Sequence, residues 1–261
     1  MHLDTPDSPP DSADQRKADR KRLWRALNIS LGFVLLLCVV FTAQAYVDWR
    51  PFAVVPHSAA GLMGVLTAPL LHGSPEHLAA NAASLIFLGT LAGGVYPRST
   101  LRAMPLIWLG SGLCAWLLGE PGSHHLGASG LTHGLFFLVF LQAFLRRDRP
   151  AVAAAMIGCL LYGGMLLTIL PRELAVSWES HLGGAVGGVL GALLFRHADP
   201  RAPRKKYSWE IEEELAAQAA LEEQAQFEPS RPDDVPVLWR RERAADGERR
   251  GVVLRFPPRG E

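Results

Sequence analysis

The sequence predicts an all-α membrane protein with six membrane-spanning helices, and three observations support this fold class. Residues 27–195 are poor in charge and rich in Leu, Ala, Gly, Val and Phe. Both flanking segments are dense in Arg, Lys, Asp, Glu and Pro, which predicts solvated tails. Within the apolar part, short basic clusters separate runs whose length is typical of membrane spans.

The first apolar run, residues 27–45, is uncharged and has nearly the length that a helix needs to cross roughly 30 Å of hydrocarbon. It follows a basic cluster that contains Arg20, Lys21, Arg22 and Arg25, so we expect it to enter the membrane from the cytoplasm. The residues before it are charged and lack the pattern of a cleaved signal peptide. We therefore expect this run to stay in the protein.

Five further apolar runs are each predicted to form one span: 77–95, 104–118, 130–145, 151–170 and 178–195. The third and fourth spans are short for a full crossing. The connection 119–129 between them is rich in Gly and Pro, so it cannot be a continuous helix. Non-helical backbone at membrane depth is tolerated only where protein buries it or where it lines a wet cavity. This connection is therefore a place to look for chemistry.

The basic residues alternate between connections in a way that predicts the topology. The connections expected in the cytoplasm and the tail carry Arg98, Arg102, Arg146, Arg147, Arg149, Arg201, Arg204, Lys205 and Lys206. The connections 46–76, 119–129 and 171–177 carry only scattered charges, among them Arg172 and Glu173. Because Arg and Lys favour the cytoplasmic side, we expect both termini in the cytoplasm and the protein in the cell (inner) membrane.

This pattern divides the chain into an N-terminal tail (1–26), a six-span core (27–196) and a charged C-terminal tail (197–261). Within the last part, 208–227 has a helix-forming composition, and the residues after it are expected to be disordered. The formal net charge is +1, and the basic residues form short clusters instead of one patch. We therefore expect the lipid bilayer, and no nucleic acid, as a partner.

The first candidate motif is Gly127-Ala128-Ser129-Gly130, where the connection 119–129 meets the fourth span. A nucleophilic serine must expose its oxygen and let backbone N–H groups approach the developing oxyanion. Neighbouring glycines permit both the turn and the close approach. Taken alone, the same tetrapeptide also fits a Gly/Ser patch for helix packing.

The second candidate is His181, near the outer end of the sixth span and followed by Gly183, Gly184, Gly187 and Gly188. Glycines at a spacing of four predict a helix that packs with its backbone close to a neighbour. An ionisable residue inside a span is a functional candidate because its burial is costly. The alternative interpretation is a histidine that reaches out to the membrane interface.

The third candidate is the pair His77 and Asn81, which are four residues apart and therefore share a face of the second span. Side-chain N–H donors on one face can point at a tetrahedral oxyanion. Either residue alone could instead form a hydrogen bond between helices.

Together these motifs resemble the rhomboid family of intramembrane serine proteases, and the resemblance covers all six spans. The family pattern of two histidines and an asparagine on one span matches His72, His77 and Asn81. The Gly-x-Ser-Gly motif that opens the fourth span matches Gly127, Ser129 and Gly130, and the glycine-rich histidine motif of the sixth matches His181, Gly184 and Gly188. Trp49-Arg50 also falls in the first outer connection, where the family carries such a pair.

The resemblance implies that Ser129 attacks the scissile carbonyl while His181 acts as general base, without an acidic third member. It implies that the Ser129 N–H, His77 and Asn81 form the oxyanion hole beside Gly127. It also implies single-span membrane proteins as substrates, and neither a cofactor nor a metal.

One departure from the family pattern concerns the residue four positions after the serine. Many members have a tyrosine there, stacked under the catalytic histidine, whereas this sequence has His133. A histidine at this position resembles rhombosortases, a branch implicated in processing C-terminal sorting tails. We expect His133 to belong to the substrate-binding part of the site.

Two other functions remain open from the sequence. One is a catalytically inactive rhomboid-like (derlin-like) protein that binds membrane clients. The other is a polytopic metal enzyme, since seven histidines lie near the outer half: His57, His72, His77, His124, His125, His133 and His181. The sequence lacks a His-Glu-x-x-His motif and offers few carboxylates there, which argues against a metal enzyme.

Overall fold

The computed structural model describes residues 13–171, 176–200 and 208–227. Several predictions lie outside these residues. They concern the disorder after 227 and the placement of Arg172, Glu173, Arg201, Arg204, Lys205 and Lys206.

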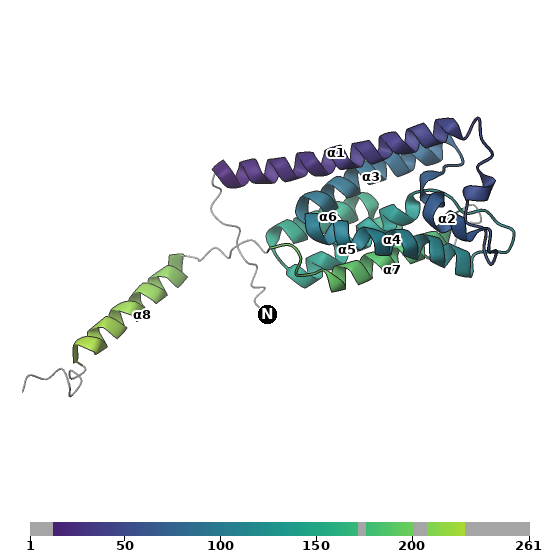
Figure 1. Ribbon diagram of the computed structural model, residues 1–261. Helices are drawn as coiled ribbons and strands as arrows, with labels where there is room; N and C mark the ends of the chain where they lie inside the picture. Colours follow the sequence, from purple (N-terminus) through teal and green to yellow (C-terminus); the bar gives the residue numbers. More distant parts are fainter. Residues whose placement is uncertain (1–12, 172–175, 201–207, 228–261) are drawn as a thin grey trace, which may run out of the picture. The chain divides into compact units, whose positions relative to one another are not determined.

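The described chain is helical and contains no strand, which confirms the all-α fold class (Figure 1). The α-helices are α1 (Ala13–Ala43), α2 (Leu62–Thr67), α3 (Pro75–Val95), α4 (Pro97–Leu118), α5 (Ser129–Arg146), α6 (Arg149–Tyr162), α7 (Trp178–Leu194) and α8 (Ser208–Phe227). Short 3-10 helices are η1 (Arg50–Phe52), η2 (Ala68–Leu70) and η3 (Gly163–Leu166). Contacts divide the chain into two units, Met1–Lys206 and Tyr207–Glu261, and the second contains α8, the helix predicted over 208–227.

Five segments in the described residues are long and apolar enough to cross a membrane: α1, α3, α4, α5, and α6 together with η3. The sixth predicted span is α7, which has 17 residues. At a rise of 1.5 Å per residue it extends about 26 Å, close to the lower limit for a span. Figure 1 shows α1 lying along α3, while α7 packs against α4 and α5.

The bounds of three spans differ from the prediction by more than two residues. Helix α1 begins at Ala13 instead of residue 27, because Arg and Lys are good helix formers and a helix need not end at the membrane surface. Helix α4 begins at Pro97, a favourable first helical residue, and α5 has 18 residues. Both are long enough to cross, so the prediction that the third and fourth spans are short for a full crossing is wrong. Helix α6 ends at Tyr162 instead of residue 170, because Gly163 and Gly164 follow and glycine disfavours a helix interior.

Glycines on two faces of α7 determine its packing. A Cβ atom at Gly183 would collide with the carbonyl oxygen of Gly110 in α4. One at Gly184 would collide with the carbonyl oxygen of Gly130 in α5. The sequence predicted close packing against one neighbour, and the structure has it against two. Backbone contact on both sides holds α7 in a fixed register between α4 and α5.

The connections predicted to be cytoplasmic meet at one end of the bundle. The Asp199 carboxylate, beyond α7, accepts hydrogen bonds from the backbone N–H groups of Arg98 and Ser99 at the start of α4, both at 2.9 Å. Arg146, at the end of α5, donates to the Asp148 carboxylate (3.0 Å) and to the Asp199 carbonyl (3.1 Å). The predicted grouping of these three connections is therefore confirmed.

The other three connections meet at the opposite end. Val54 and His125 exchange backbone hydrogen bonds of 3.0 and 2.9 Å, which joins the first outer connection to the second. The His125 ring lies 2.6 Å from the Ser177 hydroxyl, which joins the second to the third. Which end faces the cytoplasm stays a prediction.

Candidate active site

Ser129 is the first residue of α5, and tight packing explains the glycines on either side of it. Gly127 has a φ of +114°, and a Cβ atom there would lie 2.6 Å from Cε1 of His77. A Cβ atom at Gly130 would collide with the Ser111 hydroxyl and lie 2.8 Å from the Ser180 carbonyl oxygen. These contacts leave room for hydrogen alone at both positions, so the glycines bring Ser129 close to α3 and α7.

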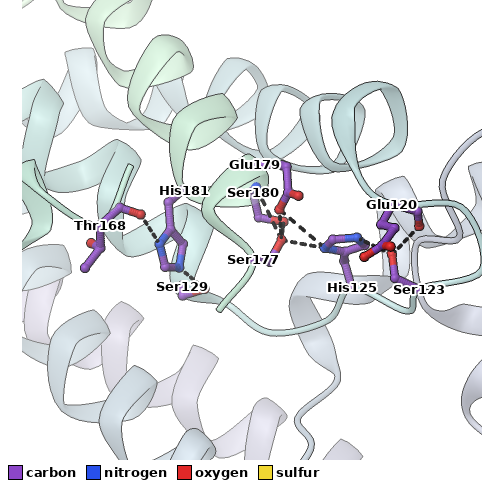
Figure 2. Close-up of polar contacts among 9 residues, drawn as sticks. All are labelled: Glu120, Ser123, His125, Ser129, Thr168, Ser177, Glu179, Ser180 and His181. Carbon is purple, nitrogen blue, oxygen red and sulfur yellow. Dashed lines mark hydrogen bonds and ion pairs between the residues drawn. The ribbon is translucent and has the colours of Figure 1, made fainter. Parts of the chain in front are cut away.

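The side chains of Ser129 and His181 are in direct contact (Figure 2). The distance from His181 Nε2 to Ser129 Oγ is 2.9 Å, and His181 Nδ1 lies 3.0 Å from the carbonyl oxygen of Thr168. A carbonyl oxygen only accepts hydrogen bonds, so Nδ1 carries the proton of the neutral ring. The Nε2 lone pair then faces the serine hydroxyl, which is the tautomer that a general base needs.

His133 stacks on the His181 ring. The two ring centroids are 3.8 Å apart and the planes differ by 12°. Its Nδ1 lies 2.7 Å from the Ser129 carbonyl oxygen, and its Nε2 lies 2.8 Å from the Thr168 hydroxyl. His133 therefore contacts the backbone of the predicted nucleophile as well as the ring of the predicted base.

His77 and Asn81 lie on one face of α3, beside Gly127 and across from Ser129. Asn81 is 4% exposed, and its Nδ2 donates to the His77 carbonyl oxygen at 3.0 Å. Both side chains line a cavity of about 1110 Å³. The same cavity is lined by Ser129, His133, Thr168 and His181, so the structure brings together all of the side chains predicted for the site.

The buried His72 ring packs against the His77 ring. His72 is 1% exposed, and its ring lies edge-on to that of His77 with centroids 5.1 Å apart. Its backbone exchanges hydrogen bonds of 2.9 and 3.1 Å with the Gln44 side chain, beyond the end of α1. Burial and the proximity of His77 lower the pKa of His72 to about 4, so this ring is neutral near pH 7.

Thr168 carries no sequence signal of a functional role. It lies in the predicted fifth span, in no motif, and its backbone carbonyl holds His181 while its hydroxyl contacts His133. The sequence also did not predict that His125 and Glu179 belong to one polar cluster. Glu179 lies in the first turn of α7, where an acidic side chain is usually exposed. Its burial, with 7% of the residue exposed, was therefore not predictable from the sequence.

The histidines of the outer half do not gather into a metal site. Among the described residues, no group of three or more His, Cys, Asp or Glu side chains has an arrangement that could hold a metal ion. The His133 and His181 ring nitrogens are instead engaged by protein oxygens.

Comparisons with known proteins agree with this architecture. The Rhomboid domain family model matches residues 59–198, which is more than half of the chain. The uncharacterized protein Rv1337 of Mycobacterium tuberculosis is 38% identical over 156 residues, which are 56% of this chain and 65% of that protein. The uncharacterized protein ML1171 of Mycobacterium leprae is 36% identical over 157 residues, 56% of this chain and 59% of that protein. The alignments thus span somewhat less than two thirds of these relatives.

Proposed function

This chain belongs to the rhomboid family, and on that basis we propose that it is an intramembrane serine endopeptidase that cleaves single-span membrane proteins. The observation that carries the proposal is the 2.9 Å contact between Ser129 Oγ and a His181 Nε2 whose lone pair faces it. An inactive relative that only binds clients has no use for a base held in this tautomer.

In the proposed reaction, Ser129 Oγ attacks the carbonyl carbon of the scissile peptide bond while His181 Nε2 takes the hydroxyl proton. The imidazolium then gives this proton to the leaving amine, the C–N bond breaks, and the acyl group stays on Ser129. A water molecule next attacks the ester with His181 again as base. The ester bond to Ser129 breaks, the carboxyl product leaves, and the serine regains its proton.

The negative charge that develops on the carbonyl oxygen needs donors. Ser129 contributes the first N–H of α5, a group with no acceptor inside its own helix, and the helix N-terminus adds a favourable dipole. His77 and Asn81 line the same cavity and supply side-chain N–H groups. In a serine protease, loss of one such donor typically costs about 2.7–4 kcal/mol of transition-state stabilisation.

A cavity that is partly polar and faces the outer end of the bundle supports hydrolysis, because water must reach the acyl-enzyme. The site lies at the end that we propose to face away from the cytoplasm, in the cell (inner) membrane. Cleavage is then expected near that face of the bilayer.

The test uses the full-length protein in proteoliposomes with a single-span reporter substrate. We expect cleavage by the wild type and none by Ser129→Ala or His181→Ala. The control Ser58→Ala, in the connection 46–76 and outside the lining of the cavity, should cleave at wild-type rates. Labelling of the wild type by a serine-directed phosphonate should disappear in Ser129→Ala.

Two results would reject the proposal. Cleavage that survives Ser129→Ala and stops with a chelator would favour the metal enzyme. Reporter binding by the wild type, with neither cleavage nor phosphonate labelling, would favour an inactive client-binding relative.

A further inference from the structure

A polar cluster outside the Ser129–His181 pair joins the segments that carry these two residues (Figure 2). His125 lies in the connection that ends at Ser129, and Ser177 and Glu179 lie at the start of α7, which carries His181. The His125 and Glu179 side chains are each 10% exposed. A buried carboxylate is costly unless it is paired or hydrogen-bonded, and this cluster supplies its partners.

The contacts form a continuous path across the cluster. The Ser123 hydroxyl donates to the Glu120 carbonyl oxygen at 2.6 Å, so Ser123 Oγ accepts from His125 Nε2 at 2.8 Å. On the other side of the ring, His125 Nδ1 lies 2.6 Å from Ser177 Oγ. Ser177 Oγ in turn lies 3.3 Å from Glu179 Oε2. The path therefore runs from Glu120 through Ser123, His125 and Ser177 to Glu179.

Because Ser123 Oγ accepts from it, His125 Nε2 carries a proton. Burial lowers the pKa of His125; Glu179 opposes this shift and His124 reinforces it. The His125 ring is also closely packed against Gly119, where an added Cβ atom would lie 2.6 Å from His125 Nε2.

The cluster lies on the same two segments as Ser129 and His181, so it can affect how these two residues are positioned. His125 precedes Ser129 by four residues, and Ser177 precedes His181 by four residues. The hydrogen bonds His125–Ser177 and Ser129–His181 thus connect the same two segments at two points, four residues apart on each segment. Among the described residues, these are the side-chain hydrogen bonds that connect the segment 119–129 to α7. Glu179 lies two residues before His181 and points to a different face of α7, so the cluster acts through the backbone.

We propose that His125 is a positioning residue that, through Ser177 and Glu179, fastens the segment ending at Ser129 to the first turn of α7 and so sets the distance between Ser129 and His181. This inference rests on the proposed protease function. A misplacement of about 1 Å in an active site can cost about 10²-fold in rate. Loss of the His125–Ser177 hydrogen bond is therefore expected to slow the acylation of Ser129 without removing any group that touches the substrate's scissile bond.

The test compares three variants of the full-length protein. His125→Phe keeps a ring but loses both hydrogen bonds, His125→Gln keeps one donor and one acceptor, and His124→Phe is the matched control on the exposed neighbour. We expect His125→Phe to lower kcat and the rate of phosphonate labelling in parallel, by about tenfold to a hundredfold, with KM nearly unchanged. His125→Gln should recover most of this loss, and His124→Phe should match the wild type.

A readout that does not depend on activity is amide hydrogen exchange in residues 119–128. His125→Phe should accelerate exchange there, and His125→Gln and His124→Phe should not. Wild-type kcat, labelling and exchange in His125→Phe would overturn the inference. So would equal losses in the Phe and Gln variants that follow a common drop in thermal stability.

Failure of the protease proposal looks different. In that case the wild type neither cleaves nor labels, while the exchange measurement still reports whether His125 fastens this segment to α7. Unchanged exchange in His125→Phe would then reject the fastening itself.

Discussion

The stack of His133 on His181 predicts that a flat ring at position 133 matters more for catalysis than its nitrogens. The rings are 3.8 Å apart and nearly parallel, and an aromatic pair of this kind contributes about 0.5–1.5 kcal/mol beyond area burial. Since 1.36 kcal/mol corresponds to a factor of ten in rate, His133→Ala should lower kcat by up to about tenfold. It leaves a space under His181 and frees that ring to tilt.

His133→Phe keeps the stacked surface and loses two hydrogen bonds. One of the affected oxygens, the Ser129 carbonyl, also accepts from the Thr132 hydroxyl at 2.7 Å, so it keeps a partner. The loss then falls mainly on Thr168, at about 0.5–1.5 kcal/mol of stability. We expect kcat to stay within about threefold of the wild type and the melting temperature to fall.

The assay is steady-state cleavage of the reporter in proteoliposomes, with thermal unfolding in detergent as the measure of stability. If Phe lowers kcat as much as Ala does, the ring nitrogens carry the effect and the stacking argument is wrong. Wild-type specific activity in His133→Ala would also refute it.

Three further predictions concern the oxyanion hole, the packing of α7 and the topology. Asn81→Ala should lower kcat by about 10²–10³-fold with little change in KM, and a purely KM effect in steady-state kinetics would contradict a role in the transition state. Gly184→Ala should destabilise the fold by about 1–3 kcal/mol, because the added Cβ atom meets a backbone carbonyl of α5. In the control Gly163→Ala the added Cβ atom has no other atom within 4 Å, and equal thermal unfolding of the two variants would disprove the packing argument. Reporters fused after Arg98 or Arg149 should lie in the cytoplasm and one within residues 119–125 outside, and a cytoplasmic signal from the last would reverse the topology.

The sequence by itself determined the class of the protein and the order of its parts. Charge depletion over 27–195 predicted a membrane core, since charged side chains are costly in hydrocarbon. The spacing of His77 and Asn81 placed them on one face, because the helical repeat is a local property of the chain. The family resemblance singled out Ser129, His181 and His133 from their motif positions alone.

Helix ends were less predictable, because propensity alone decides how far a helix continues past an apolar run. The basic residues at the start of α1 and Pro97 at the start of α4 suit a helix that continues beyond the apolar run into water. Hydropathy marks where the membrane lies and not where the hydrogen-bonded turns stop.

Only the tertiary structure decided which helix faces which. Ser129 and His181 are 52 residues apart, and their contact depends on α7 lying against both α4 and α5 through glycines on its two faces. Thr168 and His125 have no recognisable motif, since each acts through a partner from a distant segment. Periodicity specifies which residues share a face of one helix, whereas contacts between helices arise from close packing of all of them at once.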